Sequence, residues 1–294
     1  MKKVYELFAA GAGLAARGIV SVFSPSKMKK YVLGTLAVAS VATLAVALMA
    51  GDLFPGAGDL KVTYKGEVKS PLTTQKIGGV GYYSSKFQCE LETNTISKED
   101  IMTDYKNDVR YTIDHKKKVV SKETFDDMAK TLKLNWALLQ QMGIAARTEP
   151  EKAEVKTEKL GKATIAGRSC DKWKITAARK NVPYVTHVYY LDPSLDNPIQ
   201  KTRRDKWAKV AKAISSLGDL TAKLKEEADK LKGFSLKTEH ELAGITSTQE
   251  ATKVETVPIP ASVFELPKGY RVEDKGKKDL EEAQQHMKEL QKMR

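Results

Sequence analysis

The sequence predicts an α+β fold in which a curved antiparallel sheet, an incomplete barrel, is covered by amphipathic helices. Two observations predict this fold, and a third adds a helix before it. From Leu60 onward, apolar residues repeatedly alternate with polar ones, as in strands with one buried face. Two later stretches place apolar residues three and four apart, as in helices with one buried face. Before this region, the uncharged stretch 31–50 predicts an N-terminal transmembrane or signal helix.

The stretch 31–50 reads YVLGTLAVASVATLAVALMA. At about 1.5 Å per helical residue it is long enough to cross a hydrocarbon core of about 30 Å. Lys27, Lys29 and Lys30 precede it and favour an internal flank, so residues from Gly51 onward are expected outside the cytoplasm. Its length favours a retained anchor, whereas its Ala- and Val-rich composition favours a cleaved signal. The expected span includes Tyr31, Thr35, Leu44 and Leu48.

Composition and charge divide the chain into five parts. The net charge of +13 favours anionic surfaces or acidic partners, but lysines and acids are intermixed as on a solvated surface. The parts are a basic segment 1–30, the anchor or signal 31–50, a linker 51–59, a folded domain 60–274 and a charged helix 275–294.

The first strands are predicted from alternating apolar and polar residues. Residues 60–64, 87–93 and 109–113 show this alternation. The polar stretch 106–108 is a turn signal that would join two antiparallel strands. We therefore expect a meander with one buried face.

Three glycines, Gly78, Gly79 and Gly81, form a local cluster. They lack the spacing and the Lys-Ser/Thr pair of a phosphate-binding loop. We expect them to bend a curved strand.

Three helices are predicted. The first runs from about Ser121, whose side chain can cap free amides, to about Ala146. Its apolar stripe is typical of core packing, and the alternative is a helix that covers the open side of the sheet and gates a cavity. A second helix is predicted over 203–232 with Gly233 as its stop. A third helical stretch is predicted over 277–294, either as a peripheral or partner-binding helix or as a frayed tail.

Four further strands are predicted at 172–177, 184–191, 236–242 and 248–257. Both faces of 184–191 are apolar, which predicts a position in the middle of the sheet. Several prolines then end the domain.

The only cysteines are Cys89 and Cys170, both beyond the apolar stretch. In an oxidising compartment they are candidates for a disulfide that closes a loop of about 80 residues. The alternative is two buried free thiols.

No constellation for catalysis is visible. The histidines lie far apart and none has a ligand partner at metal spacing. A nucleophile elbow is missing as well, because the Gly167–Asp171 stretch lacks its second glycine. We therefore expect a protein that is not an enzyme, with no catalytic residues, no metal and no cofactor.

Four blocks carry a resemblance to a known family. They are GRSCDKWKI at 167–175, PYVTHVYYLD at 183–192, KGFSLKTE at 232–239 and ASVFELPKGY at 261–270. Together they resemble an uncharacterised family of exported bacterial proteins related to the LolA/LolB lipoprotein-carrier superfamily. The resemblance implies a LolA-like periplasmic domain over 60–274, whose sheet forms an incomplete barrel with a concave face that can hold acyl chains.

The resemblance and the apolar stretch together predict a membrane-tethered periplasmic domain that binds a hydrophobic ligand, a lipid or acyl chain, in envelope lipid or lipoprotein handling. The alternative is a structural or accessory subunit of a membrane protein complex, without a ligand. The expected location is the bacterial inner membrane facing the periplasm, or the soluble periplasm if the leader is cleaved; nucleic acid is not expected as a partner. The candidates for an apolar cavity or its lid are Phe125, Met128, Leu132, Trp136, Trp173, Ile175, Val188, Tyr190, Trp207 and Ile214.

Overall fold

The computed structural model describes residues 59–69, 73–141, 154–179, 182–195, 199–213, 223, 226–228, 230–242 and 245–292. The apolar stretch 31–50 and Ile214 lie outside these residues. None of the helices in the described part of the chain has the length and apolar character that a membrane crossing requires.

The described residues form one twelve-stranded sheet with the order β12-β6-β5-β4-β3-β2-β1-β11-β10-β9-β8-β7. Neighbours pair antiparallel, except that β12 pairs with β6 in parallel. The strands are β1 (Leu60–Lys69), β2 (Thr74–Ser84), β3 (Cys89–Asn94), β4 (Glu99–Asp104), β5 (Val109–Asp114), β6 (Val119–Thr124), β7 (Glu154–Ile165), β8 (Arg168–Arg179), β9 (Val182–Asp192), β10 (Phe234–Leu242), β11 (Ile245–Thr256) and β12 (Arg271–Asp274).

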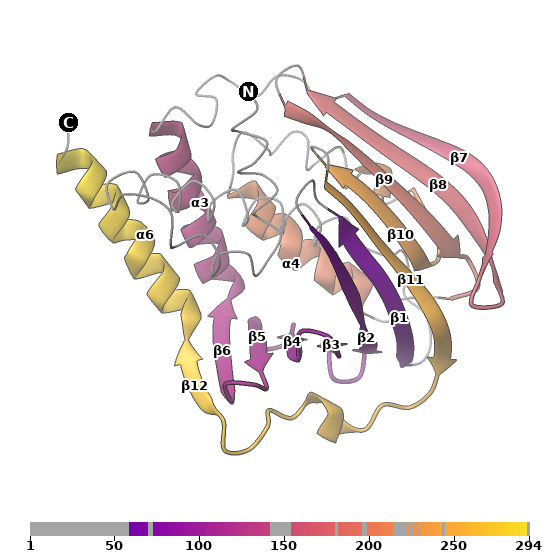
Figure 1. The fold of residues 1–294 in the computed structure, drawn as a ribbon, viewed down its shortest axis with the longest axis horizontal. Coiled ribbons are helices and arrows are strands. Elements are labelled where there is room, and N and C mark those ends of the chain that lie inside the picture. The colour runs from indigo at the N-terminus through magenta and orange to yellow at the C-terminus, as the bar shows by residue number, and fades with distance from the viewer. Residues whose placement is uncertain are drawn as a thin grey trace.

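The sheet is strongly curved and does not close on itself, because β12 and β7 are its two ends (Figure 1). The helices are α3 (Phe125–Gln141), α4 (Gln200–Lys212) and α6 (Lys275–Lys292), with a 3-10 turn η3 (Ala261–Phe264). In Figure 1 the strands follow an arc, and α4 lies on its inner side with α3 and α6 beside it. The expected curved, open antiparallel sheet with helices on its concave side is confirmed. The strand predicted in the middle of the sheet, β9, is an interior strand between β10 and β8, but it lies third from the β7 end and not at the centre.

The first predicted helix begins later than expected. Ser121 lies in β6, and α3 starts at Phe125 because Thr124 caps it: the Asp127 amide donates to Thr124 Oγ1 at 3.0 Å, and the Thr124 hydroxyl donates to Asp127 Oδ2 at 2.6 Å. The described part of the helix ends at Gln141, so the predicted end at Ala146 lies outside the described residues.

The other helix boundaries also differ from the predictions. The helix predicted over 203–232 begins at Gln200, and its described part ends at Lys212. Gly233 directly precedes β10 at a φ of 106°, where a Cβ would lie 2.3 Å from the Asp192 carbonyl oxygen. This glycine therefore serves the entry into a strand. The last helix, α6, spans Lys275–Lys292 and packs on α3 and β6.

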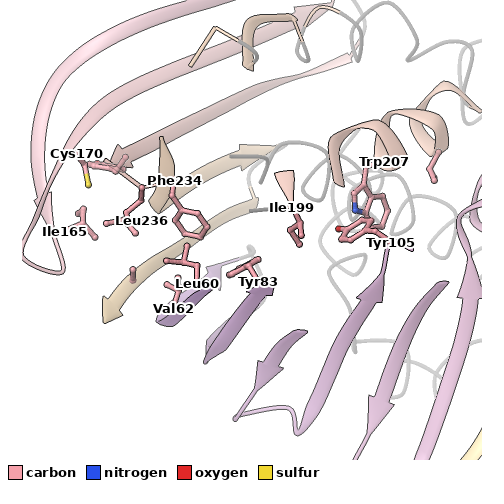
Figure 2. Packing of buried hydrophobic residues seen from close by; sticks show 14 of the residues in the cluster. Leu60, Val62, Tyr83, Tyr105, Ile165, Cys170, Ile199, Trp207, Phe234 and Leu236 are labelled. Carbon is pink, nitrogen blue, oxygen red and sulfur yellow. The ribbon is translucent and has the colours of Figure 1, made fainter. Parts of the chain in front are cut away.

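A buried apolar cluster joins α3 and α4 to the concave side of the sheet. Figure 2 shows Tyr83 and Phe234 facing each other near Leu60, and Trp207 of α4 over Tyr105. The Tyr83 and Phe234 ring centroids are 5.5 Å apart. Burial of such rings supplies much of the driving force for folding.

The glycine cluster lies within β2, which contains all three glycines, as expected for a strand and not for a phosphate-binding loop. At Gly79 the strands β2 and β3 approach so closely that a Cβ would lie 1.7 Å from the carbonyl oxygen of Thr93. At Gly78 the nearest atom, the Tyr64 carbonyl oxygen, would lie 3.5 Å away, which is an ordinary contact. The neighbouring backbone thus requires glycine at position 79, whereas position 78 tolerates replacement.

Replacing Gly79 with alanine is expected to lower the free energy of unfolding by about 1–3 kcal/mol, since backbone atoms must shift to admit the methyl group. Gly78→Ala is the matched control and is expected to change it by less than about 0.5 kcal/mol. Urea unfolding followed by circular dichroism measures both. Equal stability of the two variants would contradict the close approach.

Candidate ligand-binding site

A pocket of about 50 Å³ lies on the concave side of the sheet, between β1, β2, β3, β10 and β11 and the first turns of α4. Its apolar wall consists of Val62, Phe234, Leu236 and Ala251. Charged side chains also line it, namely Arg203, Glu92 and Lys237. The pocket is therefore amphipathic, with apolar residues on the strands and a guanidinium delivered by the helix.

Arg203 is buried, with 8% of its surface exposed. Its Nη1 lies 3.4 Å from Glu90 Oε2, and its Nε has no hydrogen-bond partner among the described residues. Tyr105 supports the pair by donating its hydroxyl to Glu90 Oε1 at 2.7 Å. The guanidinium is thus paired in charge but not fully hydrogen-bonded, which is costly for a buried group.

Two carboxylates of β3, those of Glu90 and Glu92, lie near Arg203. Glu90 and Glu92 are two residues apart on β3 and therefore share one face of that strand. Burial raises the pKa of Glu92, and the charge of Glu90 adds to this effect while Arg203 opposes it. Burial also raises the pKa of Tyr83 and of Tyr105, so both phenols stay protonated and act as donors.

A second buried carboxylate joins the helices to the sheet. Glu123 on β6 lies 3.1 Å from Arg110 Nη1 and 3.3 Å from Lys275 Nζ. The Arg110 guanidinium in turn lies over the Trp207 ring, 5.6 Å from its centroid. This network connects β5, β6, α4 and α6 at the wall of the concavity.

Two histidines form a buried pair on β9 and β10. His187 lies opposite His240, with their Nδ1 atoms 2.5 Å apart and their ring centroids 4.7 Å apart. One Nδ1 must carry a proton and donate it to the other. Burial lowers the pKa of His240 to about 4, and burial together with the charge of His240 lowers the pKa of His187 well below its ordinary value.

Acidification is expected to destabilise the protein through this pair. The unfolded state takes up a proton below about pH 6.5, whereas folded His240 resists protonation until about pH 4, so stability is lost as the pH falls through this window. The loss from His240 alone is on the order of 3 kcal/mol. Urea unfolding between pH 7 and pH 4 should show a shallower decline in the double variant His187→Leu/His240→Leu. Parallel declines would contradict the expected contribution of the pair.

The candidate cavity residues distribute as follows. Phe125, Leu132, Tyr190 and Trp207 belong to one buried cluster, and Met128, Trp136 and Val188 pack against it. Ile175 is buried on β8 apart from this cluster, and Trp173 contacts Lys159, whose Nζ lies 5.3 Å from its ring centroid. The pocket itself is lined by none of these residues.

Weak sequence signals mark the charged residues at the pocket, which are the lining residues Glu92 and Arg203 and the partner of Arg203, Glu90. Glu90 and Glu92 occupy the polar positions of an alternating strand, which predicts exposure. For Arg203 the sequence indicates only a place at the start of a helix. The one sequence signal that could have indicated the site is a pair of carboxylates two residues apart on a strand, next to aromatic residues. Such a pair can be buried when a buried cation neutralises it.

The candidate disulfide between Cys89 and Cys170 is absent: both cysteines are free and buried. Cys89 lies on β3 and Cys170 on β8, with five strands between them, whereas a disulfide needs Cα atoms within about 7 Å. Burial raises the pKa of Cys89 to about 12 and that of Cys170 to about 11. Both are therefore protonated thiols that pack in the interior.

Within the described ranges, no group of three or more histidine, cysteine or acidic side chains is placed to hold a metal ion.

Two contacts attach the block 261–270 to the sheet. His115 Nε2 lies 2.8 Å from Asp100 Oδ2, and His115 Nδ1 lies 3.0 Å from the Tyr270 hydroxyl. Phe264 packs on Phe87 with ring centroids 5.7 Å apart. The block ASVFELPKGY thus fastens the chain to the first strands of the sheet.

Fold and pocket define an α+β protein with an open, helix-covered antiparallel sheet and a small amphipathic pocket. Residues 84–270 match the family model described as "Domain of unknown function (DUF4412)". This match spans more than half of the chain, so the chain belongs to the DUF4412 family. The expected membership of an uncharacterised family is confirmed. No significant match occurs among curated proteins.

The chain is similar in fold to a number of solved structures, of which three are described. One is an uncharacterized conserved protein from Thermus thermophilus, at 7% identity and a TM-score of 0.39, covering 80% of this chain and 99% of that one. A LolA superfamily protein from Nitrosomonas europaea has 11% identity and a TM-score of 0.31, with 76% and 97% covered. A chain of the Pseudomonas aeruginosa MucA/MucB complex has 10% identity and a TM-score of 0.35, with 80% and 62% covered. At these identities and TM-scores, none of the likenesses transfers a function.

Proposed function

We propose that this protein binds a hydrophobic ligand, a lipid or acyl chain, on the concave side of its sheet beside α4. The observation that carries the proposal is the pocket on the concave side, which combines an apolar wall with the buried guanidinium of Arg203. Buried ion pairs can often be replaced by apolar residues without loss of stability. A ligand therefore accounts for this guanidinium better than stability alone. The role is binding and not catalysis.

The same proposal places the domain in the bacterial envelope. The uncharged stretch 31–50, preceded by lysines, supports export of the residues that follow it. The domain is tethered to the inner membrane and faces the periplasm if this stretch is retained, and it is soluble in the periplasm if the stretch is cleaved. A domain at this location would serve envelope lipid or lipoprotein handling.

The pocket accepts only one end of such a ligand. Its volume is about 50 Å³, whereas pockets for whole drug-sized ligands measure about 300–1,000 Å³. The remainder of an acyl chain would extend beyond the pocket along the concave side of the sheet.

Native mass spectrometry of the full chain, purified from its membranes in detergent, tests the proposal. We expect a bound lipid and saturable displacement of a fluorescent fatty-acid probe. Ala251→Leu fills the pocket and should weaken probe binding at least about tenfold, as one lost apolar contact region would. Thr252→Leu, on the neighbouring exposed residue of β11, is the matched control and should bind normally.

Absence of co-purified lipid together with absence of probe binding would overturn the proposal and favour the second candidate, an accessory subunit of a membrane protein complex. One observation favours that candidate: Phe125, Tyr105 and Trp207 fill much of the space between α4 and the sheet with the protein's own rings. A detergent pull-down that recovers one stoichiometric membrane partner would support it.

A further inference from the structure

We infer that three neighbouring segments at one end of the strands form a docking surface for an anionic lipid membrane. The segments are the β3–β4 turn 95–98, the β5–β6 turn 115–118 and the stretch 268–272 that leads into β12. We call these three segments the basic surface. The inference is independent of the pocket beside α4, because none of these residues lines that pocket.

Two backbone hydrogen bonds hold the three segments in a row. The His115 amide donates to the Lys98 carbonyl oxygen at 3.1 Å, which joins the two turns. The Arg271 amide donates to the Lys118 carbonyl oxygen at 3.0 Å, where β12 begins beside β6 (Figure 1). The row extends from β3 to β12 across the sheet order, about 20 Å at about 4.8 Å for each strand spacing.

The basic surface carries positive charge that the protein itself does not neutralise. Its residues include six lysines and arginines and no aspartate or glutamate. Lys117 pairs with Asp114, and Arg271 pairs with Glu273, both acids being on the adjoining strands. The other four basic residues are exposed and make no ion pair among the described residues: Lys98, Lys116, Lys118 and Lys268. Their charges are therefore available to an anionic partner.

Two exposed apolar side chains border these lysines. Ile96 in the β3–β4 turn is 50% exposed, and Val272 at the start of β12 is 57% exposed. Single exposed apolar residues are common on protein surfaces, but here both lie beside lysines without partners. This combination fits a membrane, where lysines attract anionic headgroups and apolar side chains enter the acyl region. An acidic protein or a nucleic acid would engage the lysines and leave both apolar side chains in water.

The basic surface can reach the same membrane as an anchor at 31–50. Strand β1 runs about 17 Å from Leu60 to Lys65, which pairs with Gly78 beside the β3–β4 turn. The nine residues 51–59 can span about 30 Å at full extension. Docking is therefore compatible with a retained anchor, and it attaches the domain to a membrane if the leader is removed.

Fluorescence quenching in nanodiscs tests the inference on the full chain. Ile96→Trp places a fluorophore on the basic surface, and brominated phosphatidylcholine quenches a tryptophan that enters the acyl region. We expect quenching at least about twofold stronger when phosphatidylglycerol is present than in purely zwitterionic nanodiscs. The difference should disappear at about 1 M salt, where the Debye length is about 3 Å.

Leu160→Trp is the matched control, because Leu160 is 47% exposed on β7 at the other end of the sheet order. It should show no difference between the two kinds of nanodisc, and the wild-type chain corrects for the three native tryptophans. Quenching of Ile96→Trp no stronger than that of Leu160→Trp would overturn the inference. Equal quenching in zwitterionic and anionic nanodiscs would overturn it as well, since the lysines would then not select an anionic surface.

Charge reversal provides a second measurement. Lys116→Glu/Lys118→Glu, introduced into the Ile96→Trp chain, should abolish the quenching that depends on phosphatidylglycerol. Lys130→Glu/Lys133→Glu, at exposed positions of α3, changes the net charge equally and should retain it. Retention of the quenching in the first variant would overturn the inference. Its loss in both variants would also overturn it, because net charge and not the basic surface would then govern binding.

Discussion

Replacing Arg203 with alanine is expected to lower the free energy of unfolding by about 3–5 kcal/mol, because it leaves a buried carboxylate without its countercharge. Glu90 is 5% exposed and retains only the Tyr105 hydroxyl as a described partner in that variant. Urea unfolding of the purified protein measures the loss. Glu92 is also buried and also loses the nearby positive charge of Arg203, which increases the loss of stability.

Two companion variants separate charge burial from helix packing. Lys209→Ala removes an exposed ion pair on the same helix, with Lys209 Nζ 2.7 Å from Asp126, and is expected to change the stability far less than Arg203→Ala because solvent screens the pair. The triple variant Arg203→Met/Glu90→Gln/Glu92→Gln removes the buried charges together and should recover most of the stability. A triple variant as unstable as Arg203→Ala would show that packing of the Arg203 stem, and not its charge, is responsible.

Phe125→Ala is expected to lower the free energy of unfolding by about 3–5 kcal/mol, the range for a buried aromatic ring. Phe125 is fully buried and stacks on Tyr105 at 6.0 Å between ring centroids, while Trp207 meets it edge-on at 5.3 Å. Loss of the Phe125 ring removes one of the contacts that hold α3 and α4 against the sheet. The intrinsic fluorescence of the native protein should shift to longer wavelength as Trp207 becomes hydrated.

The matched control for this truncation is Phe87→Ala. Phe87 is only partly buried and contacts Phe264 at 5.7 Å between ring centroids. Its truncation is expected to cost less than about half as much, since less apolar surface leaves water at that position on folding. Equal losses in the two variants would contradict the central role assigned to the Phe125 cluster.

Alternation predicts the curved sheet well but misses strands where turn signals are weak. The turns before β3, β4, β5 and β6 end in a residue with positive φ: Gln88, Lys98, Asp108 and Lys118. Only Asp108 is a type that commonly adopts this conformation, and its turn is the one that the sequence predicts. The sequence therefore does not reveal β4 and β6, and it favours a helix at Ser121 although this residue continues a strand. The parallel β12–β6 pair joins residues about 150 apart and has no local signal.

The site is less predictable than the fold. Helical periodicity identifies Phe125 and Trp207, because apolar stripes report which face is buried. It cannot identify Arg203, Glu90 or Glu92, since their partners lie on other elements and become neighbours only through the sheet order. The pair of His187 and His240 is hidden for the same reason, because strand register and not sequence spacing brings the two rings together.

The position of β1 has a consequence for any attempt to produce the family region alone. Residues 60–69 are inserted between β2 and β11, whereas the family match begins at residue 84. A polypeptide limited to 84–270 would lack both β1 and most of β2. The strands β3 and β11 would then be unpaired edge strands, which can pair with strands of other molecules. Soluble expression should therefore require the chain upstream of the matched segment, so the folding unit is larger than the family boundary.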